Sequence, residues 1–202
     1  MRNSTAEVKC RMCATFELSF SEDIEELREL ANQLTGRYGT PVRDRLKGDY
    51  FPKMQAPVVG PNGKASLLQW GFPFEGSGRV LFNARGESLQ ERPAFRPFLG
   101  NRCLVPATAF YEWDSKKQKY RFICEGLPVF YMAALWQPVM GKDGERDFRF
   151  VIITTAPYGA VEAVHNRMPA IIPRGDFHSW LSGGEITELL KPYEGPMILR
   201  KA

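Results

Sequence analysis

The sequence predicts an α+β domain in which a mostly antiparallel sheet system dominates, with a few short helices. Two observations favour this class. One amphipathic run lies near the N-terminus, and almost everything after it consists of short β-rich runs between turn residues. A chain of 202 residues with 44% hydrophobic residues is also long enough to bury a core as a single domain. A sheet system with one packing helix and no repeats is therefore expected.

The amphipathic run predicts the main helix. Ser21 is suited to cap its N-terminus, Glu22 and Asp23 suit the first turn, and Gly36 is expected to end it. The apolar side chains between them fall on one helical face: Ile24, Leu27, Leu30, Ala31 and Leu34. Such a face packs against a sheet.

The strands and turns are expected further along. The β-rich runs are Leu67–Trp70, Val80–Asn83, Tyr120–Cys124, Val129–Leu135 and Phe148–Thr155. Residues 61–63 (Pro-Asn-Gly) and 141–144 (Gly-Lys-Asp-Gly) are typical of hairpin turns. Two short helices are predicted, around Ala160–Val164 and over Asp176–Leu181.

Charge and hydropathy narrow the function classes. The chain carries 27 Lys and Arg against 23 Asp and Glu, a net charge of +4 that permits an anionic partner without requiring one. No apolar run approaches the ~18 residues of a membrane span, and the first residues lack the apolar stretch of a signal peptide. We therefore expect a cytoplasmic protein with no membrane partner.

The cysteines and histidines do not indicate a metal site or a disulfide scaffold. Four cysteines are few for this length, and free thiols are expected in a reducing compartment. Cys10 and Cys13 form a C-x-x-C pair, but there is no second pair and neither histidine stands at ligand spacing from a cysteine. No metal and no cofactor are expected.

Four short motifs carry groups that suit one chemistry. Cys13 follows Met12, and a cysteine that becomes the first residue offers an amine and a thiol on adjacent carbons. That pair captures an aldehyde as a five-membered thiazolidine ring. Three further motifs supply an amide, a carboxylate and an imidazole: Asn83-Ala84-Arg85, Phe110-Tyr111-Glu112-Trp113 and His165-Asn166-Arg167-Met168-Pro169.

Together these motifs resemble the SRAP family (SOS response-associated peptidase), from about Cys13 to near Leu199. The resemblance implies a barrel-like arrangement of strands in one domain, residues 13–202, with residues 1–12 an N-terminal extension or a mis-assigned start. It implies a DNA-damage function, in which the protein senses abasic sites in single-stranded DNA and bonds to them covalently. It also implies a monomer that associates with the nucleoid when it binds DNA.

The resemblance assigns catalytic roles to four residues. Cys13 is the covalent nucleophile and Asn83 positions it against the abasic sugar. Glu112 performs acid–base work on the terminal amine and the sugar, and partial burial between aromatic residues is expected to raise its pKa. His165 promotes opening of the sugar ring and imine chemistry. The resemblance also implies that the Glu112 carboxylate takes part in releasing the residue before Cys13.

The resemblance also implies a DNA-binding surface. Arg85 is expected to grip a flanking phosphate, because a planar guanidinium matches phosphate oxygens. Trp70, Phe72 and Pro73 resemble an apolar wedge on which a base stacks, and Thr154 matches a threonine that contacts DNA. A core tryptophan followed by a turn explains Trp70 equally well.

The chain departs from the family pattern beside the nucleophile. The family begins Cys-Gly-Arg, whereas this chain has Ala14 and Thr15 after Cys13. Thr15 cannot replace the charge of an arginine on a phosphate, so DNA affinity is affected more than chemistry. Arg85 is then expected to matter more than usual.

Two other functions stay open from the residues. Cys13, His165 and Glu112 are also the groups of a cysteine-type peptidase acting on other proteins. The arginines and aromatic residues alone suffice for a non-covalent reader of single-stranded or modified DNA. The covalent function requires a free amine on Cys13, through translation from Met12 and methionine removal or through cleavage of the Met12–Cys13 bond by the domain itself.

Overall fold

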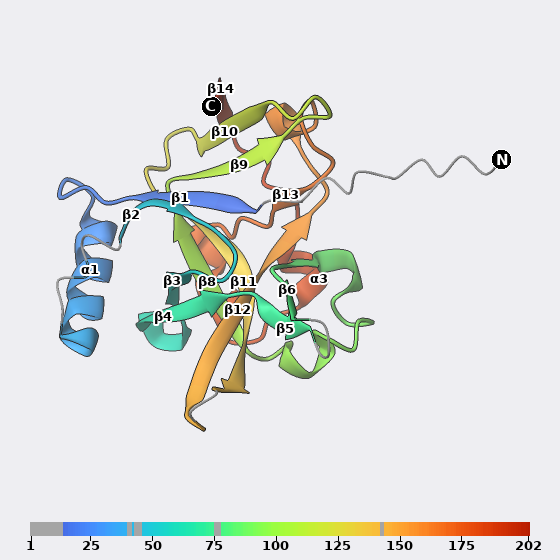
Figure 1. Cartoon of the computed structure of the whole chain (residues 1–202). Helices are drawn as coiled ribbons and strands as arrows, with labels where there is room; N and C mark the ends of the chain where they lie inside the picture. The colour runs from blue at the N-terminus through green and yellow to red at the C-terminus, as the bar shows by residue number, and fades with distance from the viewer. Residues whose placement is uncertain (1–13, 40–41, 43–45, 75–77, 142–143) are drawn as a thin grey trace.

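The computed structural model describes residues 14–39, 42, 46–74, 78–141 and 144–202. Two sheets form most of the fold (Figure 1). The first is five-stranded in the order β14-β10-β9-β1-β2 and antiparallel throughout. Its strands are β1 (Thr15–Ser19), β2 (Lys47–Tyr50), β9 (Ala109–Trp113), β10 (Lys119–Cys124) and β14 (Met197–Lys201).

The second sheet closes into a ring, which confirms the barrel-like prediction. Its strand order is β11-β8-β3-β4-β12, and β12 also pairs with β11. These five strands therefore form a closed sheet without an edge strand. All of these pairings are antiparallel except that of β12 with β4. The strands of the ring are β3 (Gln55–Val59), β4 (Ala65–Trp70), β8 (Arg102–Ala107), β11 (Phe130–Met140) and β12 (Arg146–Thr155).

Two short strands extend the ring beside β12. β7 (Asn83–Arg85) runs parallel to β12, and β13 (Met168–Pro169) runs antiparallel to it. A separate hairpin consists of β5 (Phe72–Phe74) and β6 (Arg79–Leu81). The run predicted as one strand over Val80–Asn83 is therefore divided between β6 and β7.

The predicted helix is present as α1 (Glu25–Tyr38), but both of its ends differ from the prediction. Leu27, Leu30, Ala31 and Leu34 form its buried face, as the periodicity predicted. The N-cap is Ile24 rather than Ser21. The C-cap is Gly39, whose left-handed φ of 66° lets its amide donate to the carbonyl of Thr35, and Gly36 lies inside the helix.

The remaining helices for which the described residues give complete bounds are short and lie in connections. They are α2 (Phe177–Leu181), α3 (Ile186–Leu189) and the 3-10 turns Pro61–Gly63, Gly86–Ser88, Arg96–Phe98, Gly159–Val161 and Arg174–Asp176. The two short helices predicted from sequence correspond to the turn at Gly159–Val161 and to α2. Within the described residues, no helix combines the length and apolar character that a membrane crossing requires.

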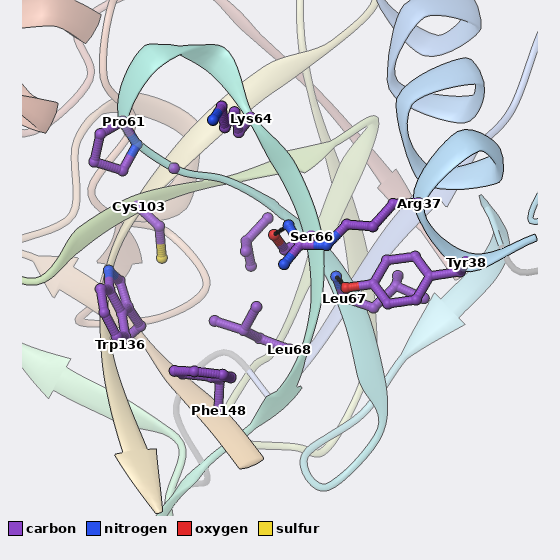
Figure 2. Close-up of a pocket in the computed structure, with 12 residues that line it drawn as sticks. Arg37, Tyr38, Pro61, Lys64, Ser66, Leu67, Leu68, Cys103, Trp136 and Phe148 are labelled. Carbon is purple, nitrogen blue, oxygen red and sulfur yellow. Dashed lines mark hydrogen bonds between the residues drawn. The ribbon is translucent and has the colours of Figure 1, made fainter. Parts of the chain in front are cut away.

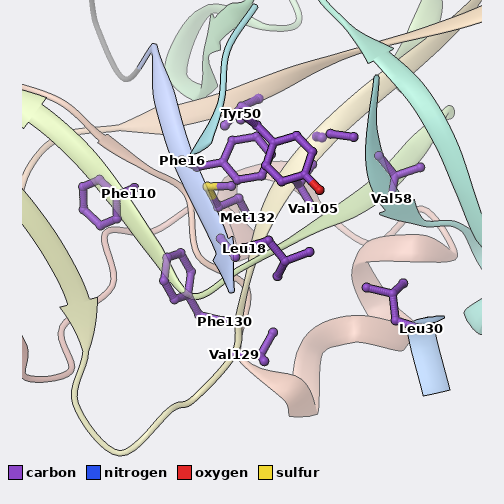
Figure 3. Packing of buried hydrophobic residues seen from close by; sticks show 14 of the residues in the cluster. Phe16, Leu18, Leu30, Tyr50, Val58, Val105, Phe110, Val129, Phe130 and Met132 are labelled. Carbon is purple, nitrogen blue, oxygen red and sulfur yellow. The ribbon is translucent and has the colours of Figure 1, made fainter. Parts of the chain in front are cut away.

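Packing between the two sheets joins them into one core (Figure 3). Phe16 of β1 stacks on Tyr50 of β2 with ring centroids 4.9 Å apart, and it also contacts Trp70 of β4 at 5.2 Å. Phe110 of β9 stacks on Phe122 of β10 at 4.9 Å. The inward face of β9 therefore points into this core, and Glu112 lies two residues after Phe110 on the same face.

A polar network on the outer face of the five-stranded sheet fixes β1. Glu17 accepts two hydrogen bonds from Arg121 of β10, at 2.7 and 2.8 Å, and one from the Tyr111 hydroxyl at 2.7 Å. These Arg121 hydrogen bonds lower the pKa of Glu17 from 4.5 to about 2, against the effect of partial burial, and Ser19 and Tyr111 contribute to the same lowering. The network spans β1, β9 and β10.

Arg121→Ala is expected to destabilise the fold and to change its acid sensitivity. Because the pKa of Glu17 is depressed in the folded state, its ionised form stabilises the fold above pH 4.5, and that contribution is lost as the pH falls toward 2. We expect a loss of about 2 kcal/mol at pH 7 and a flatter pH dependence between pH 5 and about 2. Urea unfolding at several pH values measures both.

Arg200→Ala is the matched control, because Arg200 is an exposed arginine opposite Arg121 on β14. Its unfolding curves should overlay those of the wild type at every pH. Equal losses in the two variants would show that the network does not stabilise β1.

Candidate active site

Glu112 and His165, two of the residues to which the sequence analysis gave catalytic roles, lie next to each other in the interior. Glu112 lies on β9 with 0% of its surface exposed, and His165 is 7% exposed after the turn at Gly159–Val161. The His165 Nδ1 atom is 3.6 Å from the Glu112 Oε2 atom. The carboxylate is thus fully rather than partly buried, and it is placed for proton exchange with an imidazole once small movements shorten the contact.

The surroundings of His165 favour a neutral ring. Burial lowers the pKa of His165, a hydrogen bond with the backbone of Arg167 opposes that effect, and the charge of Arg167 adds to the lowering. Nδ1 lies 3.2 Å from both the amide nitrogen and the carbonyl oxygen of Arg167, so either tautomer finds a partner. A neutral imidazole can accept a proton near neutral pH.

Arg167 connects this site to the neighbouring strands. Its guanidinium donates to both carboxylate oxygens of Glu87, at 2.7 and 2.8 Å, and to the carbonyl oxygen of Thr154 at 2.6 Å. Arg167 is 8% exposed, whereas the Glu87 side chain is 55% exposed. The ion pair therefore reaches from the interior to the surface and holds β12, the segment after His165 and the turn at Gly86–Ser88 together.

The two β7 residues that the sequence selected lie on this side of the molecule. Asn83 stands opposite Ile152 and Arg85 opposite Thr154 in the parallel pairing with β12. Asn83 is half-buried, on the sheet face of Ile152, which belongs to the same core cluster as Phe110. Asn83 therefore faces the same core cluster to which the inward face of β9 contributes Phe110.

Arg85 is exposed and close to the Glu87–Arg167 pair. Burial raises the pKa of Glu87, but the hydrogen bonds and charge of Arg167 together with the charge of Arg85 bring it below its ordinary value. Two guanidinium groups thus flank one carboxylate at the surface end of the site. Thr154, by contrast, is 0% exposed, and Arg167 occupies its hydroxyl and carbonyl oxygens.

Trp70 and Phe72 are core side chains rather than an exposed wedge. Trp70 is 0% exposed, packs against Phe16 and Phe150, and donates its indole N–H to the Phe82 carbonyl at 2.7 Å. Phe72 is 1% exposed. A base cannot stack on either ring in this structure, because neighbouring rings already cover both.

A tight turn at Gly71 separates these two rings. Gly71 has a φ of 118°, and a Cβ there would stand 2.9 Å from Val80. The chain therefore turns tightly, and both rings point into the core. Pro73 and Phe74 follow as the exposed residues of that segment.

The start of β1 lies beside Glu112. Thr15 pairs with Tyr111, and the next position along β9 is Glu112. β2 pairs with β1 on the edge opposite β9, with Tyr50 beside Phe16. Phe51 follows Tyr50 and is 46% exposed. Cys13, the expected nucleophile, lies outside the described residues, as do residues 1–12.

The described cysteines and acidic groups suggest no other reactive centre. Cys103 and Cys124 are free and buried, and burial raises the pKa of both thiols, that of Cys124 to about 12. Neither is a nucleophile at neutral pH. Among the described residues, no three His, Cys, Asp or Glu side chains converge in a way that could hold a metal ion.

The chain also matches a known family model over almost its whole length. The family model described as SOS response associated peptidase (SRAP) matches residues 12–201. The chain belongs to the SRAP family. The matched range includes Asn83, Glu112 and His165 and ends one residue before the C-terminus.

Relatives of this SRAP protein share a common description. It is 35% identical over 172 residues to the abasic site processing protein YoaM of Bacillus subtilis. This alignment covers 73% of this chain and 76% of YoaM. It is 34% identical over 150 residues to YoqW, an abasic site processing protein of the same organism, covering 67% of each chain. Both relatives are named for abasic site processing.

Solved structures confirm the fold of this SRAP protein. A crystal structure of a protein from Bacteroides thetaiotaomicron superimposes with a TM-score of 0.77 over 94% of this chain and 91% of that one, at 24% identity. A protein from Bordetella bronchiseptica gives 0.73 at 19% identity, over 94% and 99% of the two chains. At these identities the likeness concerns the fold alone.

Two residues that the sequence analysis did not assign stand out in the site. Arg167 lies in the same motif as His165, so its position next to an assigned residue was an available signal. Phe51 is an exposed ring directly after β2, and the run Tyr50-Phe51-Pro52 has counterparts in the SRAP family, although the sequence indicated no chemistry for it.

Proposed function

We propose that this protein senses abasic sites in single-stranded DNA and bonds to them covalently through Cys13, within a single domain formed by residues 13–202. The observation that carries the proposal is the fully buried Glu112 carboxylate, 3.6 Å from the His165 imidazole and beside the start of β1. The names of the Bacillus relatives support the substrate.

The chemistry balances without a cofactor. The terminal amine of Cys13, whose ordinary pKa is ~7.7–8.0, attacks the aldehyde carbon of the ring-opened sugar and releases one water to form an imine. The thiol then adds to the imine carbon and its proton passes to the nitrogen, which closes the thiazolidine. Glu112 and His165 carry protons in these steps.

The amine has to be free for this reaction. With residues 1–12 attached, the nitrogen of Cys13 is an amide, which cannot form an imine. We propose that Glu112 and His165 also assist cleavage of the Met12–Cys13 bond, unless the mature chain already starts at Cys13. Intact-mass analysis of the protein from its native source distinguishes a chain that begins at Cys13 from one that retains Met1.

The DNA contacts in this proposal follow the exposed side chains. Arg85 binds a phosphate, and Phe51 supplies the stacking ring, because Trp70 and Phe72 are buried. Thr15, at the start of β1, contributes no charge.

One experiment tests the covalent function. The chain that begins at Cys13 is incubated with an oligonucleotide containing one abasic site. The mixture is then denatured, and the mass of the protein species is measured by mass spectrometry. A species with the mass of protein plus DNA minus one water supports the proposal. Turnover of an unrelated peptide without an adduct would support a peptidase, and binding that disappears on denaturation would support a non-covalent reader.

Arg85→Ala is expected to weaken binding to single-stranded DNA of any sequence and to reduce the salt dependence by about one phosphate contact. Arg167, the other guanidinium near Glu87, is 8% exposed and already donates to both Glu87 carboxylate oxygens, so it cannot replace Arg85. Fluorescence anisotropy at several salt concentrations measures the slope. Arg200→Ala serves as the control, and normal affinity of Arg85→Ala at moderate salt would contradict the phosphate role.

A further inference from the structure

Figure 2 shows a pocket of about 250 Å³, and none of the residues that line it belongs to the candidate active site. It opens between the C-terminal end of α1, the β3–β4 hairpin and the start of the β11–β12 pairing. Its walls are mainly apolar, formed by Val58, Leu67, Leu68, Trp136 and Phe148. Phe148 lies six positions before Thr154 on β12, roughly 20 Å along the strand, so the pocket is separate from the site.

The charged side chains at this pocket have one sign. Arg37 and Lys64 line it, and among the described lining residues there is no carboxylate. Arg37 uses its Nη1 group to bind the Ser66 hydroxyl at 2.6 Å and the Ala65 carbonyl at 3.3 Å. Both cations are exposed, and neither forms an ion pair with any carboxylate of the described residues.

The apolar surface continues beyond the pocket along one face of the β11–β12 hairpin. Pro138 stands opposite Phe148 and Met140 opposite Arg146, so these four side chains share a face with Trp136. Met140 is 70% exposed and Phe148 40% exposed. Exposed apolar side chains that gather in one patch are characteristic of an interaction site.

The apolar face of the hairpin is positively charged, as the pocket is. Arg146 lies on the apolar face and adds a third cation. Asp147 points to the opposite face, where it accepts a hydrogen bond from Arg149 at 3.2 Å.

We propose that this pocket and the adjoining hairpin face bind an extended acidic segment of a partner protein. One apolar side chain of the segment fills the pocket between Leu68, Trp136 and Phe148. Its carboxylates pair with Arg37, Lys64 and Arg146, since this surface carries cations and no competing anion among the described lining residues. The exposed Met140 extends the contact beyond what a small ligand covers.

A DNA strand fits this surface less well. Base stacking needs open ring faces in succession. Trp136 and Phe148 instead meet edge to face, with centroids 5.8 Å apart and planes at 66°. The third ring at the pocket, Tyr38, has the Arg37 guanidinium over it at 5.6 Å, and Val58, Leu67 and Leu68 supply aliphatic walls. Aliphatic walls suit a leucine-like or phenylalanine-like anchor.

Selection from a displayed library of short random peptides tests the proposal on the full chain. Enriched peptides should combine an apolar residue with flanking Asp or Glu. Synthesised with a fluorophore, they should lose about tenfold or more in affinity for Phe148→Asp and for Lys64→Glu. Leu199→Asp and Lys116→Glu, which change an exposed apolar and an exposed basic residue elsewhere, should leave the affinity unchanged.

Three results would overturn the proposal. No enrichment, or enrichment of basic peptides, contradicts the predicted chemistry. Binding that is indifferent to Phe148→Asp and Lys64→Glu places the peptide elsewhere. A matching loss of affinity for an intact single-stranded oligonucleotide in these two variants assigns the surface to nucleic acid. Thermal unfolding and adduct yield should equal those of the wild type, so that a folding defect is recognised.

Discussion

Cys13→Ala and Cys13→Ser variants of the chain that begins at residue 13 are expected to form no denaturation-resistant complex with abasic DNA. Alanine retains the amine but has no thiol, so the reaction stops at an imine that water reverses. Serine closes an oxazolidine ring, which is far less stable than the thiazolidine. Denaturing electrophoresis and intact mass measure the adduct, whose yield should fall to background in both variants.

Two controls accompany this prediction. Cys103→Ala and Cys124→Ala should give the wild-type adduct yield, because both thiols are buried and their raised pKa values keep them protonated. The unfolding curves of the Cys13 variants should match the wild type. A full adduct yield from Cys13→Ala would move the covalent bond to another residue and end the thiazolidine mechanism.

The sequence predicted the elements of the fold better than their assembly. The spacing of Leu27, Leu30, Ala31 and Leu34 specified the buried face of α1, because periodicity depends only on neighbouring residues. The predicted C-terminal end of the helix was wrong. Two glycines lie near it, Gly36 and Gly39, and only Gly39 adopts the left-handed backbone conformation that ends the helix. Helix boundaries of this kind depend on which glycine the surrounding structure holds in the left-handed conformation.

The closure of the ring had no local signal. It depends on the parallel pairing of Arg149 with Gln69 and Phe150 with Trp70, between segments far apart in the chain. The same pairing explains why Trp70 is buried, although the family resemblance implied an exposed wedge there. Packing against Phe150 and Phe16 instead favours the other interpretation, a core tryptophan followed by a turn.

The candidate site was predicted through motif resemblance rather than through physics. Nothing in the residues around Glu112 or His165 indicates that they meet, because their contact requires β9 and the segment after β12 to face one core. Arg167 had a signal in its motif, but its bidentate bond to Glu87 depends on a turn from another part of the chain. Burial and partners of this kind follow from tertiary packing alone.

Glu112→Gln is expected to slow adduct formation by about a hundredfold or more while leaving DNA affinity unchanged. The amide keeps the shape of the side chain but cannot accept a proton, and general acid–base groups contribute factors of about 10² to 10⁴. Single-turnover kinetics on an abasic oligonucleotide measure the rate. Anisotropy with the same oligonucleotide lacking the lesion measures the affinity.

The free energy of unfolding separates a functional role for Glu112 from a structural one. A carboxylate with 0% exposure is costly to keep charged, and a neutral isostere removes that cost. Glu112→Gln should therefore be as stable as the wild type or more stable, even though it reacts slowly. His165→Ala should likewise lose rate more than affinity. If Glu112→Gln instead lowered stability and DNA affinity along with the rate, the buried carboxylate would be a structural partner of His165 and the proton-transfer role would be wrong.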